Sequence, residues 1–413
     1  MTAITDQVVE RFLNYVKIDT QSDDKSSTFP STKNQFDLAN ILVNELKALG
    51  LSDVSVDEHC QVRATLEGSL YNSKVPVIGL IAHMDTSPEV SGKDVKPQIH
   101  KNYKGGDIVL KGVTIREQIN PELKKYIGHD LITSDGTTLL GADDKAGIAE
   151  IMTAFQYLKE HPEIKYATLK IAFTPDEEVG KSITHFDVKK FGAKYAYTVD
   201  GIELGEIEDE TFNAAKAEFN ILGANAHPGY AKGKMVNSQR IAAKVIDMIP
   251  YEESPEMTEE DQGFYHVLRS NMNVDQSTIE VLIRDFDESK FEDRKRRLWE
   301  LQNQICRLYQ RGIITLKIED QCQNMKKILD KYPEVVDIAV EAIKKAGIQP
   351  IHKKVRGGTD GATLSYMELP TPNLFAGGLN FHSNTEYVPV NSMVKATEVL
   401  VNIPQIYVQR YTA

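Results

Sequence analysis

Residue types that bind metal ions or transfer protons gather at a few points of this 413-residue chain, and most of these points follow apolar, strand-like runs. Histidine and carboxylate side chains are the ligands that zinc takes in hydrolases, and two zinc ions need about six ligand bonds. The candidates are His83 and Asp85 after residues 76–82, Asp143 at the start of a helical pattern, Glu177 and Glu178 after residues 168–173, Asp200 after residues 195–199, and His382 late in the chain. Together these residues predict the site of a two-metal hydrolase.

The runs before these residues indicate how the fold positions them. Residues 76–82 are almost continuously apolar, which is typical of a strand buried on both faces of a parallel sheet. Open α/β sheets bind ligands at the carboxyl ends of such strands. Side chains two residues apart on a strand point the same way, so we expect Asp85 to accept the second ring N–H of His83.

Each candidate taken alone has a structural interpretation. A single His or Asp after a strand is most often a cap or a hydrogen-bonded loop residue, and adjacent acids such as Glu177 and Glu178 are usually solvated. Only the combination favours a metal site.

Hydrophobic periodicity predicts an α/β fold. Apolar stripes over residues 8–16 and 39–49 predict two helices, and alternation of helices with strands predicts a mostly parallel sheet. Residues 213–324 instead read as two strand and helix pairs, which favours a ferredoxin-like α+β domain. His382 follows this block and the other candidates precede it, so we expect a lid domain inserted between catalytic segments 1–212 and 325–413.

Composition excludes several classes of partner. The formal net charge of −12 argues against a nucleic-acid partner, and the basic run 294–297 lies among acidic residues in a helical pattern typical of a solvated face. We expect no membrane partner and a cytosolic location, because the polar start has no export signal and no stretch reaches membrane-spanning length. The three separated cysteines predict reduced thiols.

Four segments of the chain resemble the peptidase T family, cytosolic tripeptide aminopeptidases among the dinuclear zinc exopeptidases. They are residues 83–88, 135–147, 173–180 and 356–361, and the resemblance extends over essentially the whole chain. It implies two zinc ions per subunit, with His83 and Asp200 on one, Glu178 and His382 on the other, and Asp143 bridging both. Three carboxylates and one hydroxide would leave this cluster nearly neutral, which favours its burial. The resemblance also implies a cis peptide bond after Asp143.

Glu177 is the candidate general base for a water molecule activated by the two zinc ions, because neighbouring residues of an extended chain point to opposite sides and Glu178 is the ligand. Asp85 would hold His83 in orientation. The resemblance implies that His227 stabilises the oxyanion on domain closure, sometimes across a homodimer, although a structural turn is an equal alternative. Arg284 and Arg356 are candidates for the substrate carboxylate. The alternatives are an ion pair with a nearby aspartate for Arg284 and a loop brace for Arg356.

We therefore expect a zinc aminopeptidase that releases the N-terminal residue of tripeptides. A carboxypeptidase, dipeptidase or N-acyl amino acid deacylase on the same fold is the nearest alternative, because the metal chemistry is the same for any amide. A non-catalytic zinc-binding protein is the alternative of another class, and Glu177 argues against it because such a protein has no need of a general base.

Overall fold

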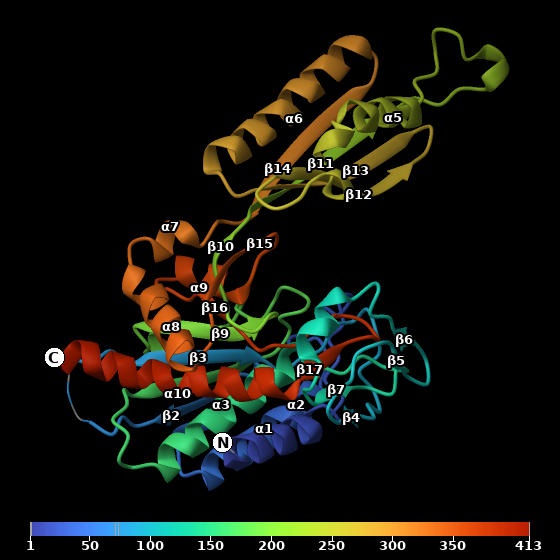
Figure 1. Ribbon diagram of the computed structural model, residues 1–413. Helices are drawn as coiled ribbons and strands as arrows, with labels where there is room; N and C mark the ends of the chain where they lie inside the picture. Colours follow the sequence, from blue (N-terminus) through green and yellow to red (C-terminus); the bar gives the residue numbers. More distant parts are fainter. Residues whose placement is uncertain (1, 71, 73, 413) are drawn as a thin grey trace. The chain divides into compact units, whose positions relative to one another are not determined.

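The computed structural model describes residues 2–70, 72 and 74–412, and the chain forms two compact units (Figure 1). The first unit contains the described residues up to Asp209, Lys327–Lys353, and those from Leu364 onward. The second unit contains Glu210–Lys326 and Lys354–Thr363. Each unit has a hydrophobic core of its own, so each is described by itself.

An eight-stranded mixed sheet forms the centre of the first unit, in the order β1-β2-β8-β3-β9-β16-β10-β15. Its strands are β1 (Ser52–Val56), β2 (Val62–Leu66), β3 (Ile78–His83), β8 (Leu169–Thr174), β9 (Tyr195–Gly201), β10 (Glu206–Thr211), β15 (Ile351–Val355) and β16 (Asn373–Phe375). The central strands β8, β3, β9 and β16 pair in parallel, whereas β1 with β2, β2 with β8, and β10 with β16 are antiparallel. The sheet, predicted to be mostly parallel, is parallel at its centre and antiparallel toward its edges, since a short connection such as β1 to β2 allows only antiparallel pairing.

The helices cover both faces of this sheet. They are α1 (Thr2–Tyr15), α2 (Gln35–Ala48), α3 (Ala142–Glu160), α4 (Val188–Phe191), α8 (Pro333–Lys345) and α10 (Val390–Thr412), with α7 (Lys326–Leu329) and α9 (Asp360–Tyr366) where the chain passes from one unit to the other. On one face, α3 and α10 run side by side (Figure 1) and bury Leu80 and Tyr197 in the main core. On the other face, Ile81 packs with Phe191 and Leu364. The two predicted helical stripes are confirmed as α1 and α2.

A small antiparallel sheet in the first unit was not predicted. It has the order β17-β7-β4, with β4 (Gln98–His100), β7 (Leu131–Thr133) and β17 (Tyr387–Pro389). The chain between β4 and β7 forms the hairpin β5 (Ile108–Val109) and β6 (Thr114–Ile115) and the 3-10 helix η1 (Pro121–Tyr126). Strands of two or three residues are too short to show a hydrophobic period. Pairing of β17 with β7 brings the segment before Tyr387 close to the segment that precedes α3.

The second unit is ferredoxin-like, as the sequence predicts. Its elements are β11 (Asn213–Leu222), α5 (Ser238–Met248), β12 (Phe264–Met272), β13 (Gln276–Asp285), α6 (Glu288–Leu308) and β14 (Ile313–Cys322), with the 3-10 helices η2 (Pro228–Tyr230), η3 (Tyr251–Glu253) and η4 (Pro255–Met257). The sheet order is β12-β13-β11-β14, all antiparallel, and both helices lie on one face (Figure 1). Strand β12 was not predicted, because it is an edge strand whose second half is exposed and polar.

The sequence-based boundaries at 213 and 324 leave out residues 354–363, which belong to the second unit. Arg356 of this segment contacts the second unit, because its guanidinium lies 5.5 Å from the ring centroids of both Phe212 and Phe264, two rings that pack edge to face. Contact of a cation with aromatic rings stabilises the attachment of this segment.

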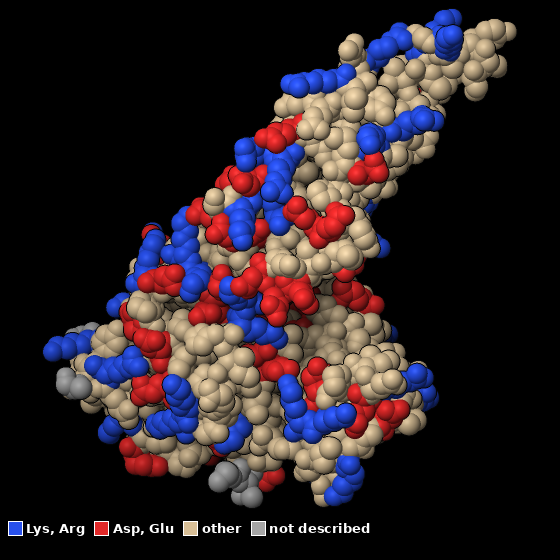
Figure 2. Space-filling model, turned by 45° about the horizontal axis from the view of Figure 1, so that its top comes forward, with Lys and Arg blue, Asp and Glu red and all other residues tan. Residues whose placement is uncertain are grey.

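Charges of both signs are interspersed on the face shown in Figure 2. The basic run 294–297 follows this pattern, because each of its four residues forms an ion pair with a carboxylate. Within the described residues, no helix is both long enough and apolar enough to span a bilayer.

Candidate metal centre

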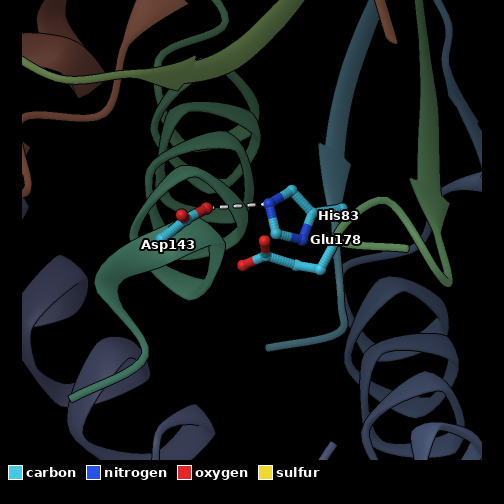
Figure 3. A group of neighbouring side chains, drawn as sticks. All are labelled: His83, Asp143 and Glu178. Atoms are coloured by element: carbon cyan, nitrogen blue, oxygen red, sulfur yellow. Dashed lines mark hydrogen bonds and ion pairs between the residues drawn. The ribbon is translucent and has the colours of Figure 1, made fainter. Parts of the chain in front are cut away.

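The candidate ligands come together at the carboxyl edge of the central strands. In the parallel register His83 pairs with Thr174, and Ile81 pairs with Thr198, so Asp200 lies level with His83. The chain continues from Thr174 to Glu178, and Asp143 approaches from the first turn of α3 (Figure 3). The edge that the sequence predicts as the ligand edge therefore gathers these side chains, as parallel α/β sheets do.

Asp143 lies between two histidines. Its Oδ1 is 2.8 Å from His83 Nε2, and its Oδ2 is 3.1 Å from His382 Nε2. Burial raises the pKa of Asp143, but the hydrogen bonds from the two histidines outweigh burial and hold that pKa well below its usual range. Each carboxylate oxygen thus faces a different imidazole nitrogen. The peptide bond to Asp144 is cis, as the resemblance implies.

The other two carboxylates divide between the two histidines. Asp200 Oδ1 lies 3.5 Å from His83 Nε2, and Glu178 Oε2 lies 2.8 Å from His382 Nε2. Burial, with a smaller contribution from the charge of Asp143, raises the pKa of both carboxyls to about 7, although the neighbouring histidines lower it. His83, Asp143 and Glu178 offer ligand atoms that all lie within 4.8 Å of one another.

This donor set fits bound divalent cations. Two imidazoles and three carboxylates converge in a largely buried space, and Glu178 Oε1 is buried with no hydrogen-bond partner among the described residues. A buried carboxylate oxygen without a donor is costly unless a cation faces it. Hydrogen bonds to Asp143 and Glu178 raise the pKa of His382 to about 11.

Asp144 makes a second group with His83 and Asp200 in which ligand atoms are equally close. Its carboxylate has other partners, however. Oδ2 accepts the backbone N–H of His83 at 3.2 Å, and Oδ1 accepts that of Gly147 at 3.1 Å. Asp144 therefore supports the end of β3.

Asp85 is fully buried and contacts His83. The ring Nδ1 of His83 lies 3.1 Å from the Asp85 carbonyl oxygen and 3.5 Å from its carboxylate. The carboxylate also accepts the backbone N–H groups of Glu177 and Glu178, at 3.0 and 3.2 Å. Asp85 thus orients His83 through its carbonyl and carboxylate together, and it fixes the loop that carries the two glutamates.

Three supporting residues were missed by the sequence analysis. Glu386 accepts the backbone N–H of Asp143 at 3.1 Å, Asn373 Oδ1 accepts that of Asp200 at 3.1 Å, and Glu89 lies 2.7 Å from His382 Nδ1. The only local signal was closeness to a candidate ligand, since Glu386 follows His382 by four residues and Glu89 follows His83 by six.

The other predicted residues lie in the second unit. The exposed His227 accepts the backbone N–H of Gly229 on Nδ1. Arg284 donates to the carbonyls of Ala215 and Ile283 and to Gln321, and it has no ion pair among the described residues. The alternative of an ion pair with a nearby aspartate is therefore not seen, and Asp285 pairs with Arg294 instead.

The guanidinium of Arg356 has hydrogen-bond partners on both of its terminal nitrogens. Its Nη1 donates to the Glu260 carbonyl, and its Nη2 donates to the carbonyl and hydroxyl of Thr258. With its two flanking rings, this guanidinium braces the loop before β12.

Known proteins similar to this chain share its fold and family. The model of peptidase family M20/M25/M40 matches residues 135–405. The chain is 54% identical over 406 residues to a Peptidase T of Clostridium botulinum (strain Hall), and the match covers 98% of this chain and 99% of that protein. It is 52% identical over 407 residues to a Peptidase T of Geobacillus kaustophilus, again covering 98% of this chain and 99% of that protein. The crystal structure of aminopeptidase PepT from Bacillus cereus matches with a TM-score of 0.76 and 25% identity over 98% of both chains. The sequence, the fold and the site agree in one assignment: this chain belongs to the M20/M25/M40 family of peptidases.

Proposed function

We propose that the protein is a zinc-dependent aminopeptidase that releases the N-terminal residue of tripeptides. The observation that carries the proposal is the Asp143 carboxylate, which faces His83 with one oxygen and His382 with the other. A carboxylate in this position can bridge two metal ions. The similarity of this chain to proteins named Peptidase T supports the choice of tripeptides as substrates.

The proposed ligands follow the two pairs of side chains next to Asp143, which are His83 with Asp200 and His382 with Glu178. His83 and Asp200 would hold one zinc ion, Glu178 and His382 would hold the other, and Asp143 would share its oxygens between them. Nitrogen and oxygen donors of this kind suit zinc. Zinc ions bound here would supply the positive charge that makes a water molecule acidic near neutral pH and that stabilises the developing oxyanion.

Glu177 is the proposed general base. Its backbone N–H is held by Asp85, and it directly precedes the proposed ligand Glu178, which supports a place for it next to the ligand set. We propose that Glu177 accepts the proton of the attacking water and delivers it to the departing amine.

The substrate carboxylate is proposed to bind an arginine of the second unit. Arg284 fits this role because its guanidinium is half-buried and has no carboxylate partner among the described residues. For Arg356, contact with the substrate stays a prediction, and its observed partners also fit the loop brace. Oxyanion binding by His227, a homodimer and a cytosolic location also stay predictions.

A panel of peptides tests the proposal. Purified protein is incubated with di-, tri- and tetrapeptides, an N-acetylated tripeptide and N-acyl amino acids, and products are identified by mass spectrometry. We expect fastest release of the N-terminal residue from free tripeptides, loss of this activity in chelator, and its return with zinc. Release of the C-terminal residue, or preference for the N-acyl substrates, would instead establish one of the related amidohydrolase functions. Zinc binding without turnover of any substrate would indicate the non-catalytic function.

A further inference from the structure

Glu386 binds the backbone of the turn that carries Asp143. Its side chain is buried, with the residue 1% exposed. Oε2 accepts the backbone N–H groups of Leu140 and Gly141 at 2.7 and 2.8 Å, and Oε1 accepts the N–H of Asp143 at 3.1 Å. One carboxylate therefore holds the chain on both sides of Ala142.

These amides need an acceptor from outside α3. The first N–H groups of a helix have no partner within it, and Gly141 at the N-cap position provides no side chain to accept them. Asp143 and Asp144 also have non-helical backbone angles. The buried carboxylate of Glu386 fills the place of a capping residue, although it comes from more than 240 residues away.

Glu386 is also part of the loop that carries His382. Backbone hydrogen bonds in both directions between Leu379 and Tyr387, of 2.8 and 3.0 Å, close this loop. The N–H of Glu386 donates to the carbonyl of Ser383 within it. Glu386 therefore connects the loop of His382 to the turn of Asp143, two side chains that are 239 residues apart in sequence.

We propose that Glu386 is a positioning residue that sets the separation between the Asp143 carboxylate and His382, and thereby the metal affinity of the site. The inference rests on the proposed function, because it takes Asp143 and His382 as ligands of one ion. Metal sites tolerate ligand displacements of only about 0.2 Å, so small movements of this turn matter. A residue that only braced the fold would change stability without changing metal affinity in the folded protein.

The test replaces Glu386 by glutamine, which has the same shape. If the amide oxygen faces Leu140 and Gly141, the amide nitrogen faces the N–H of Asp143, and two donors then oppose each other. We expect the folded variant to bind zinc about 10- to 100-fold more weakly, as loss of outer hydrogen bonds to metal ligands does. Zinc occupancy is measured by equilibrium dialysis in chelator-buffered zinc, and the visible spectrum of the cobalt-substituted protein reports the ligand geometry.

Glu150→Gln is the matched control. Glu150 is a fully buried carboxyl of α3, and neither of its oxygens has a hydrogen-bond partner among the described residues. This variant should keep the zinc affinity and the cobalt spectrum of the wild type. If Glu386→Gln does not fold, Glu386→Asp retains the charge but withdraws the carboxylate by one methylene group, and the same loss of zinc affinity is expected.

The outcomes separate this inference from the function on which it rests. Wild-type protein that fails to bind two metal ions would contradict the proposed function and the inference together. Wild-type protein that binds two, with a folded Glu386 variant of equal affinity and unchanged cobalt spectrum, would overturn the inference alone. Weaker binding in the Glu386 variant, with the Glu150 control unchanged, would establish the positioning role.

Discussion

Replacing Arg284 by alanine should remove the recognition of the substrate's C-terminal carboxylate. The guanidinium of Arg284 lies on β13, where burial lowers its pKa, and its hydrogen-bond partners are the carbonyls of Ala215 and Ile283 and the side chain of Gln321. A half-buried cation with only neutral partners gains much from a carboxylate, which arginine can bind with two parallel hydrogen bonds.

The size of the effect follows from the burial of this contact. Truncating one partner of a buried, hydrogen-bonded charge pair costs about 2–5 kcal/mol. Because each tenfold change in rate corresponds to about 1.36 kcal/mol, the expected loss in kcat/KM is about 30- to 5,000-fold. Arg284 is only partly buried, so the lower part of this range is expected.

The assay is a double cycle of protein and substrate. We measure kcat/KM for a free-acid tripeptide and for its C-terminal amide, with the wild type and with Arg284→Ala. The wild type should prefer the acid, and the variant should treat acid and amide alike, because each change removes the same contact. Arg269→Ala, at an exposed position of the neighbouring strand β12, is the control and should leave both rates unchanged.

Equal slowing of acid and amide by Arg284→Ala would refute this reasoning, since a residue that reads the carboxylate must distinguish the two substrates. Arg356→Ala measured in parallel decides between its two interpretations. A carboxylate contact impairs the acid more than the amide, whereas a loop brace slows both by the same factor.

Three further predictions concern the metal centre and the core beside it. Glu177→Gln should keep the fold and full metal content but lower kcat by about 10²–10⁴-fold, because an amide cannot accept the proton of water; rapid turnover at full occupancy would exclude the role. Asp143→Ala should lose both metal ions, whereas His382→Ala should lose chiefly one, and equal single-ion losses in elemental analysis would contradict the bridge. Burial raises the pKa of Glu150 well above its usual value, so the folded protein keeps a proton that the unfolded chain releases. Because of this proton, the free energy of unfolding should fall by about 1.4 kcal/mol per pH unit above about pH 4.3, until the pH reaches the pKa of the folded state. Glu150→Gln should remove this decline in urea unfolding between about pH 5 and 7, and parallel profiles for both proteins would count against it.

Much of the fold could be predicted because local patterns carry the information. The helical stripes of α1 and α2 and the apolar run of β3 follow from side-chain periodicity, which is set by neighbours in sequence. Short or exposed elements carried no such pattern. Strand β12 is half exposed, and β4 and β7 have three residues each.

The supporting residues of the site show the same limit. Glu386 is one of 60 acidic residues in the chain, and nothing in its neighbourhood distinguishes it except the nearby His382. Its importance arises from three backbone N–H groups that lie more than 240 residues away in sequence. Likewise, the partners that Arg284 finds among the described residues, the carbonyls of Ala215 and Ile283 and the side chain of Gln321, depend on how β13, β11 and β14 pair.

The sequence by itself determined the chemical types of the candidate ligands, the α/β class and the edge of the sheet where the ligands gather. These depend on residue identity and on hydrophobic period, both of which are local. Only the tertiary structure decided that Asp143 faces His83 and His382 with different oxygens, that Asp85 holds the amides of Glu177 and Glu178, and that Glu386 holds the amide of Asp143. Hydrogen bonds depend on distances of a few tenths of an ångström between segments remote in sequence, and those distances are set by packing of the whole unit.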